Sequence, residues 1–225
     1  MKFTSMKWSA LPVAVLMLGS VAMAQDQSSA STQSSSGSST TTPAPATTPK
    51  PTVAQRKENQ QDRIANGVKS GQLTAGETAN LETKEAAING ETKADRAANG
   101  GKLTAAEKTQ INKQQNQVSK QIYADKHNAN TQKYGNSEVG QRQKNQQARI
   151  AQGIKSGQMT AGEAAKAENQ QKGINQQVKA DRAANGGKLT TGEKAQVNKE
   201  QNAASKNIYN KKHNAKTQPQ AQPKK

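Results

Sequence analysis

The ten residues Asp95–Thr104 read DRAANGGKLT, and the same ten residues recur without change at Asp181–Thr190. The same offset of 86 positions relates several shorter stretches on either side, without a gap. Duplicated sequence normally forms duplicated structure, because each copy encodes the same local packing. We therefore expect two tandem units, unit A at about 54–130 and unit B at about 139–215, joined by a linker at 131–138.

Each unit contains the pattern Gly-x-[Leu/Met]-Thr-x-x-Glu twice, which is typical of a helix start. A threonine N-cap accepts a hydrogen bond from the N3 amide, and a glutamate at N3 reaches back to the N-cap amide. The glycine tolerates the left-handed backbone that ends a preceding helix. The predicted cap pairs are Thr74 with Glu77, Thr104 with Glu107, Thr160 with Glu163 and Thr190 with Glu193, and the glycines are Gly71, Gly101, Gly157 and Gly187.

These signals predict an all-α fold made of two tandem three-helix units with short Gly/Thr loops. In unit A we expect helices at about 54–67, 75–97 and 105–128. A narrow apolar stripe on each helix favours a small bundle of antiparallel neighbours. In unit A the stripes consist of Ile64, Val68, Leu81, Ile88, Ile111, Val118 and Ile122.

Small residues affect the expected packing in two ways. Unit B has alanine at two positions where unit A has a larger apolar residue, so we expect unit B to be the less stable copy. Glycine also occurs within both middle helices, at Gly90 and Gly173, where we expect local breaks. The alanines are Ala167, which replaces Leu81, and Ala204, which replaces Val118.

The N-terminal residues have the features of a secretory signal peptide. Lys2 and Lys7 precede an apolar run that ends in Ala22-Met23-Ala24, after which the chain becomes polar. We expect residues 1–24 to be removed by cleavage after Ala24; an uncleaved membrane anchor is the alternative. No later segment is apolar enough to cross a bilayer, so the sequence predicts an exported protein, either periplasmic or secreted.

Composition limits both the fold and the chemistry. Residues 25–53, rich in Ser, Thr, Gln and Pro, are predicted to be a disordered linker, and residues 216–225 a disordered basic tail. Apolar residues make up only 30% of the chain, which leaves little material for a core. Loss of the signal lowers the formal net charge only from +17 to +15.

Catalytic and cofactor sites are not expected. The chain has no cysteine and two histidines, one per unit, which is too few for a structural zinc site within a unit. It also lacks a Ser-His-Asp or Cys-His set and a Gly-rich phosphate loop. We therefore expect no enzyme activity and no cofactor.

The loops before the capping glutamates resemble the calcium loops of EF-hand proteins. Counted from Asn66, the turn glycine is sixth, an apolar residue eighth and Glu77 twelfth. However, Val68 or Ile154 occupies the third position, where EF-hands usually carry a carboxylate. The capping box explains the same residues without a metal. The resemblance implies calcium ligands at Asn66, Ser70, Thr74 and Glu77 in unit A and at Gln152, Ser156, Thr160 and Glu163 in unit B.

The third helix of each unit carries a cation every seven residues, opposite its apolar stripe. Such a row can follow an anionic polymer or the headgroups of a membrane surface, although the same row is also expected on the solvated side of any amphipathic helix. Few aromatic side chains are available for base stacking, which disfavours nucleic acid as the partner. The rows are Lys113, Lys120 and His127 in unit A and Lys199, Lys206 and His213 in unit B.

Together these features predict a non-enzymatic, exported helical-repeat protein that associates with anionic cell-envelope material through its basic helix faces. One alternative is a calcium-responsive module built on the EF-hand-like loops. Another is a stress protectant, because the composition, with 17 glycines and few large apolar residues, resembles that of hydrophilins. That resemblance implies action through hydration rather than at a site, whereas four capping boxes favour an ordered chain.

Overall fold

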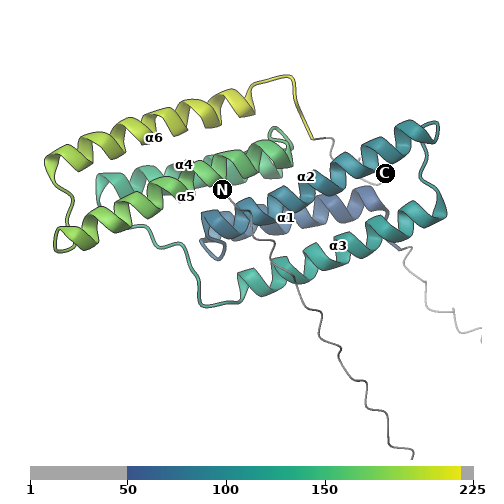
Figure 1. Cartoon of the computed structure of the whole chain (residues 1–225), viewed down its shortest axis with the longest axis horizontal. Helices are drawn as coiled ribbons and strands as arrows, with labels where there is room; N and C mark the ends of the chain where they lie inside the picture. The colour runs from purple at the N-terminus through teal and green to yellow at the C-terminus, as the bar shows by residue number, and fades with distance from the viewer. Residues whose placement is uncertain (1–49, 219–225) are drawn as a thin grey trace, which may run out of the picture. The chain divides into compact units, whose positions relative to one another are not determined.

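A computed structural model describes residues 50–218, which form six α-helices and no β-strand. Unit A contains α1 (Val53–Ser70), α2 (Ala75–Ala98) and α3 (Ala105–Lys126); unit B contains α4 (Glu138–Lys155), α5 (Ala161–Ala184) and α6 (Thr191–Lys212), as Figure 1 shows. The predicted all-α fold is confirmed. The predicted signal peptide (1–24), the linker up to residue 49 and the tail from residue 219 lie outside the described residues.

Local hydrogen bonds set the helix starts. At α2, the Glu77 amide donates to Thr74 Oγ1 at 3.3 Å, and the Thr74 amide donates to Glu77 Oε2 at 2.9 Å. The same reciprocal pair begins α3, α5 and α6, and Thr52 with Gln55 begins α1 in the same way. The hydroxyl of Ser137 caps α4. Because one such cap contributes about 1 kcal/mol, these pairs matter in a chain with few apolar residues.

Glycines in the left-handed backbone region follow the helices, as their spacing predicts. Gly71 ends α1 with φ 75°, and Gly157 follows α4 with φ 69°. Gly101 and Gly187 have φ 87° and 88° in the loops after α2 and α5. A side chain in this region is strained by its own backbone, which is why glycine occupies these turns.

The middle helices continue without interruption through Gly90 and Gly173, so the prediction of local breaks there was wrong. A glycine costs a helix only about 1 kcal/mol relative to alanine, which packing on both sides of it can offset. A Cβ at either position would meet no atom within 4 Å. These two glycines therefore mark neither a turn nor a close helix contact.

Buried glutamines supplement the thin apolar core of each unit. Gln60 Nε2 donates to the carbonyl oxygen of Gln115 at 2.6 Å, and Gln115 Nε2 donates to the carbonyl oxygen of Val53 at 2.9 Å, which ties α1 to α3. Gln146 and Gln201 repeat both bonds in unit B. The Oε1 atom of each of these four glutamines has no hydrogen-bond partner among the described residues. The amides therefore fix which helices pair rather than add much net stability, because an unpaired buried oxygen costs about as much as one hydrogen bond contributes.

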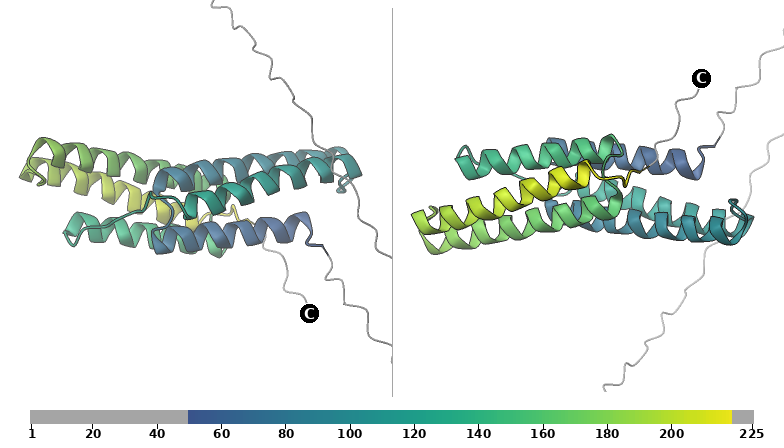
Figure 2. Two further views of the ribbon diagram at one scale, coloured as in Figure 1. Left: turned by 90° about the horizontal axis from the view of Figure 1, so that it is seen from below. Right: turned by 90° about the horizontal axis from the view of Figure 1, so that it is seen from above.

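The most extensive helix packing joins the two units. α2 lies against α5 and α1 against α4, in the arrangement shown in Figure 2. Gly76 at the start of α2 faces Lys172 in the middle of α5, and Gly162 at the start of α5 faces Ala86 in the middle of α2. The two helices therefore run antiparallel, and the units are related by an approximate twofold axis.

One hydrophobic core extends across both units, and a smaller one lies in unit B. Leu81 of unit A and Ala167 of unit B both belong to the shared core and are at most 1% exposed. Ala167 therefore packs at the interface between the units, so its small side chain affects the core that both units share rather than unit B alone. Ala204 lies in the smaller core with Val139, Ile174, Val178 and Val197.

Equivalent backbone hydrogen bonds hold the segments that follow α3 and α6. The Gln132 N–H donates to the Gly71 carbonyl and the Gln218 N–H to the Gly157 carbonyl, both at 2.8 Å. Gln218 is only 8% exposed. Ordered structure thus extends beyond residue 216, the predicted start of the disordered tail.

Candidate functional site

The two predicted basic rows lie on the solvent side of α3 and α6. Every residue of both rows is exposed, whereas Ile111, Val118 and Ile122 on the other side of α3 are buried. Lysines seven residues apart are separated by about 10 Å along a helix axis. The rows are Lys113, Lys120 and His127 on α3, and Lys199, Lys206 and His213 on α6.

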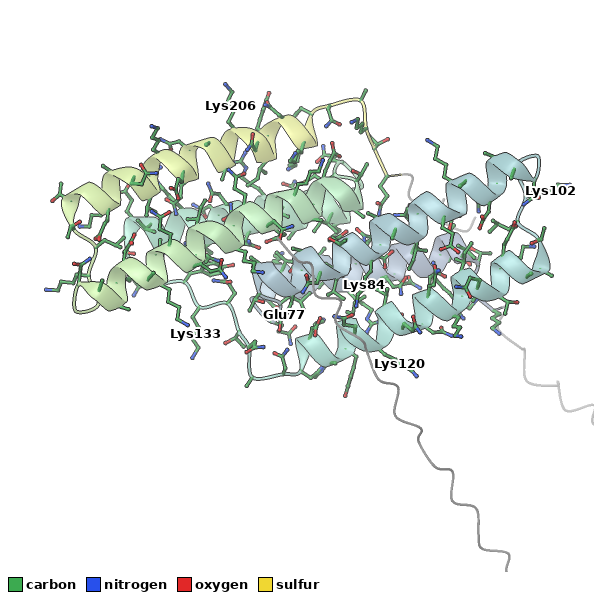
Figure 3. All side chains as sticks on the ribbon, in the orientation of Figure 1. Glu77, Lys84, Lys102, Lys120, Lys133 and Lys206 are labelled. Atoms are coloured by element: carbon green, nitrogen blue, oxygen red, sulfur yellow. The ribbon has the colours of Figure 1, made fainter. Side chains whose placement is uncertain are left out.

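The lysines of these rows carry charge that no described residue neutralises. Within residues 50–218, none of the four makes a side-chain hydrogen bond or ion pair. α3 and α6 do not contact each other, and Figure 3 shows Lys120 and Lys206 pointing away from the helices on opposite sides. The structure therefore presents two separate cationic rows rather than one continuous patch.

Each row ends in a stacked tyrosine–histidine pair. The Tyr123 and His127 rings have centroids 4.2 Å apart, and the Tyr209 and His213 rings 4.1 Å. Each histidine Nδ1 also lies within 2.8 Å of the carbonyl oxygen of its tyrosine, which fixes the ring at the helix end. The tyrosines are 62% and 56% exposed. They were not among the predicted site residues, although the Tyr-x-x-x-His spacing occurs in both units.

The EF-hand-like loops use their glutamates for hydrogen bonds within the protein. Glu77 Oε2 accepts from the amide and hydroxyl of Thr74, and Oε1 accepts from the side-chain amides of Asn128 at 2.7 Å and Asn130 at 3.2 Å. Burial raises the pKa of Glu77, but these hydrogen bonds outweigh burial and hold the pKa below its ordinary value. Both oxygens that a calcium ion would need already face donors.

Glu163 repeats this arrangement, with Thr160 on Oε2 and Asn214 on Oε1. Three of the other predicted ligands make hydrogen bonds within the protein. Ser70 Oγ and Ser156 Oγ donate to nearby carbonyl oxygens, and Gln152 Oε1 accepts from Lys212 Nζ at 3.0 Å. Asn66 is exposed on α1. Within the described part of the chain, no three His, Asp or Glu side chains gather where they could hold a metal ion. The calcium site stays a prediction.

Buried carboxyl groups lie where α2 meets α5. Glu82 accepts from Gln61 Nε2 at 3.1 Å, and Glu168 accepts from Gln147 Nε2 at 2.7 Å; both glutamates are 0% exposed. The second oxygen of each has no hydrogen-bond partner among the described residues. Burial raises the pKa of Glu168 to about 8 and that of Glu82 well above its usual range, although the glutamines act in the opposite direction. Glu168 therefore holds its proton near neutral pH, and burial favours the protonated form of Glu82 as well.

Glu85, one turn further along α2, is the third buried acid. It is 0% exposed, and neither carboxyl oxygen has a hydrogen-bond partner within residues 50–218. Burial raises the pKa of Glu85 to about 7, against the opposing charge of Lys57 on α1. At the equivalent positions unit B has Gln171 and Gln143. The acid and its nearby cation are thus replaced together by two neutral amides.

None of the helices in the described range has both the length and the apolar composition required to cross a membrane. The chain matches no protein-family model, no curated protein and no solved structure.

Proposed function

We propose that this protein is exported and non-enzymatic, and that it associates with anionic cell-envelope material through the basic rows of α3 and α6. The observation that carries the proposal is the presence of an exposed, unpaired lysine row at the same place in both copies of the fold. An ammonium group without a local counter-charge keeps its attraction for external anions. The stacked tyrosine beside each row adds a partly apolar surface at the same helix end.

The separation of the two rows favours bivalent binding. Because α3 and α6 do not touch, each row is free to bind its own segment of an anionic polymer. Two linked weak sites can bind about 10² to 10⁴ times more tightly than either alone. A polymer or a surface, which offers many anions, is therefore a better partner than a single small anion.

The test measures binding of the purified protein to immobilised alginate, a carboxylated polysaccharide, at about 50 and 200 mM salt. Three variants remove the α3 lysines (K113Q/K120Q), the α6 lysines (K199Q/K206Q) or all four. A control, K144Q/K166Q, removes equal charge from exposed positions on α4 and α5. We expect wild-type binding to weaken with salt, each two-lysine variant to lose at least tenfold, and the four-lysine variant to lose nearly all binding.

Two results would contradict this proposal. One is binding that does not change with salt, since lysine-driven association must weaken as counterions compete. The other is an equal loss in the K144Q/K166Q control, which would show that net charge alone decides the affinity.

A further inference from the structure

A cavity of about 570 Å³ opens between unit A and the start of unit B. α1 and α2 form most of its wall. Gln115 of α3, the start of α5 and the segment after α6, which runs toward α2 in Figure 1, form the rest. Val53, Ile88 and Ala161 give the wall an apolar part. The volume lies within the range of small-ligand sites, which is about 300 to 1,000 Å³.

Three cations line this cavity: Lys57 on α1, and Lys93 and Arg96 on α2. None of them makes a side-chain hydrogen bond or ion pair with another described residue. Burial lowers the pKa of Lys57, and the charge of Arg96 adds to this effect, against the opposing charges of Glu85 and Glu82. Lys93 and Arg96 are exposed at the mouth of the cavity, so the cost of burial falls on Lys57, and an anion between the three cations would offset it.

The cavity wall also contains a polar atom without a partner. The hydroxyl oxygen of Thr92 is buried and has no hydrogen-bond partner among residues 50–218. An orphaned buried hydroxyl costs about 1 to 3 kcal/mol, so such atoms usually have a partner. This oxygen exposes no surface to the cavity, so a ligand would reach it only after the Thr92 side chain turns toward the cavity.

The equivalent place in unit B differs at the positions of Lys57, Thr92 and Arg96. Gln143 stands in place of Lys57, and Gln143 Nε2 donates to Asn175 Oδ1 at 2.6 Å. Arg182, the counterpart of Arg96, donates to the Ser137 hydroxyl in the linker at 3.3 Å. Val178 stands in place of Thr92, which removes the orphaned hydroxyl. Lys179, the counterpart of Lys93, likewise makes no side-chain hydrogen bond or ion pair with a described residue. The features specific to unit A are thus Lys57, the unpaired state of Arg96 and the Thr92 hydroxyl.

We propose that the cavity of unit A binds an organic phosphate, with the phosphate group among Lys57, Lys93 and Arg96 and the organic part against Val53, Ile88 and Ala161. A phosphate monoester carries about −1.5 to −2 charges, which balances three cations better than one carboxylate does. The planar guanidinium of Arg96 suits two phosphate oxygens at once. This inference goes beyond the proposed function, because it uses neither basic row.

NMR titration of the ¹⁵N-labelled protein with phenyl phosphate tests the proposal. We expect saturable shifts of the amides at 53–57 and 89–96, smaller shifts with inorganic phosphate and none with phenol. A parallel titration with a short-chain phosphatidate compares the affinity of the cavity for a lipid headgroup with its affinity for a free phosphate ester. Shifts spread over α3 and α6 with no preference for the cavity would overturn the proposal.

Unit B provides the matched control. K57Q, which installs the residue of unit B, and R96Q are each expected to weaken phenyl phosphate binding at least tenfold. R182Q removes the equivalent arginine of unit B and should change the affinity less than twofold. The K113Q/K120Q/K199Q/K206Q variant should bind phenyl phosphate normally, which separates this site from the rows. Equal weakening by R182Q and R96Q would refute the cavity site.

Discussion

Replacing Glu85 with glutamine is expected to stabilise the protein at alkaline pH. The chain itself has glutamine at the equivalent buried position, Gln171, so the substitution suits this interface. Burial raises the pKa of Glu85 from 4.5 to about 7 in the folded protein, so the folded state holds this proton more tightly than the unfolded state. The resulting stabilisation is complete below pH 4.5 and is lost as the pH rises through about 7.

The size of this loss follows from the same pKa. The change from 4.5 to about 7 corresponds to about 3.5 kcal/mol, at about 1.4 kcal/mol per pH unit. This free energy already includes the effect of the Lys57 charge, because that charge lowers the pKa of Glu85. Glu168, with a pKa of about 8, adds a loss of the same order over a slightly more alkaline range. Since small proteins are stable by about 5 to 15 kcal/mol, these losses are a large part of the total.

Urea unfolding followed by circular dichroism at pH 5, 7 and 9 measures the effect. E85Q and the wild type should differ by less than about 1 kcal/mol at pH 5, whereas at pH 9 the variant should be more stable by about 2 to 3 kcal/mol. E58Q, which removes a partly exposed carboxylate on α1, serves as the control and should show no such dependence. If the difference between E85Q and wild type were the same at all three pH values, the buried acid would not be protonated in the folded state and the reasoning would fail.

Three further substitutions test the packing and the caps by thermal or urea unfolding. Gly67→Ala should destabilise the protein by about 1 to 3 kcal/mol, because the new Cβ would lie 2.7 Å from Leu73 Cδ1. An unchanged stability would mean that the loop containing Leu73 moves aside at no cost. Gly90→Ala, with no atom within 4 Å of the new Cβ, should instead stabilise α2 by about 1 kcal/mol, and a loss of stability would contradict the open surroundings described here. Thr104→Ala removes the α3 cap and should cost about 1 kcal/mol, whereas Thr104→Ser should restore most of it.

Helix starts were predictable from the sequence because capping is a local interaction. The reciprocal bonds of Thr74 and Glu77 involve residues three positions apart, so no knowledge of the tertiary fold was needed. The predicted middle helix at 75–97 agrees with α2, Ala75–Ala98, for this reason. The continuity at Gly90 was not predicted, because it depends on contacts made elsewhere along α2.

The buried acids were missed because charged residues are normally read as surface positions. A usable signal was nevertheless present: Leu81, Glu85 and Ile88 have helical spacing, so Glu85 falls on the apolar stripe of α2. The packing of α2 against α5 was also not predicted. It depends on which faces of two distant helices meet, and the periodicity of each helix alone does not decide that.

The approximate twofold interface lies within a single polypeptide, and this changes how it responds to dilution. Two separate chains meeting through these surfaces would come apart at low concentration, all the more once their central acids ionise. Tethered partners instead experience an effective concentration on the order of millimolar. The halves therefore stay together even in trace amounts of protein, and a single proteolytic cut between Thr131 and Glu138 would make their cohesion depend on concentration.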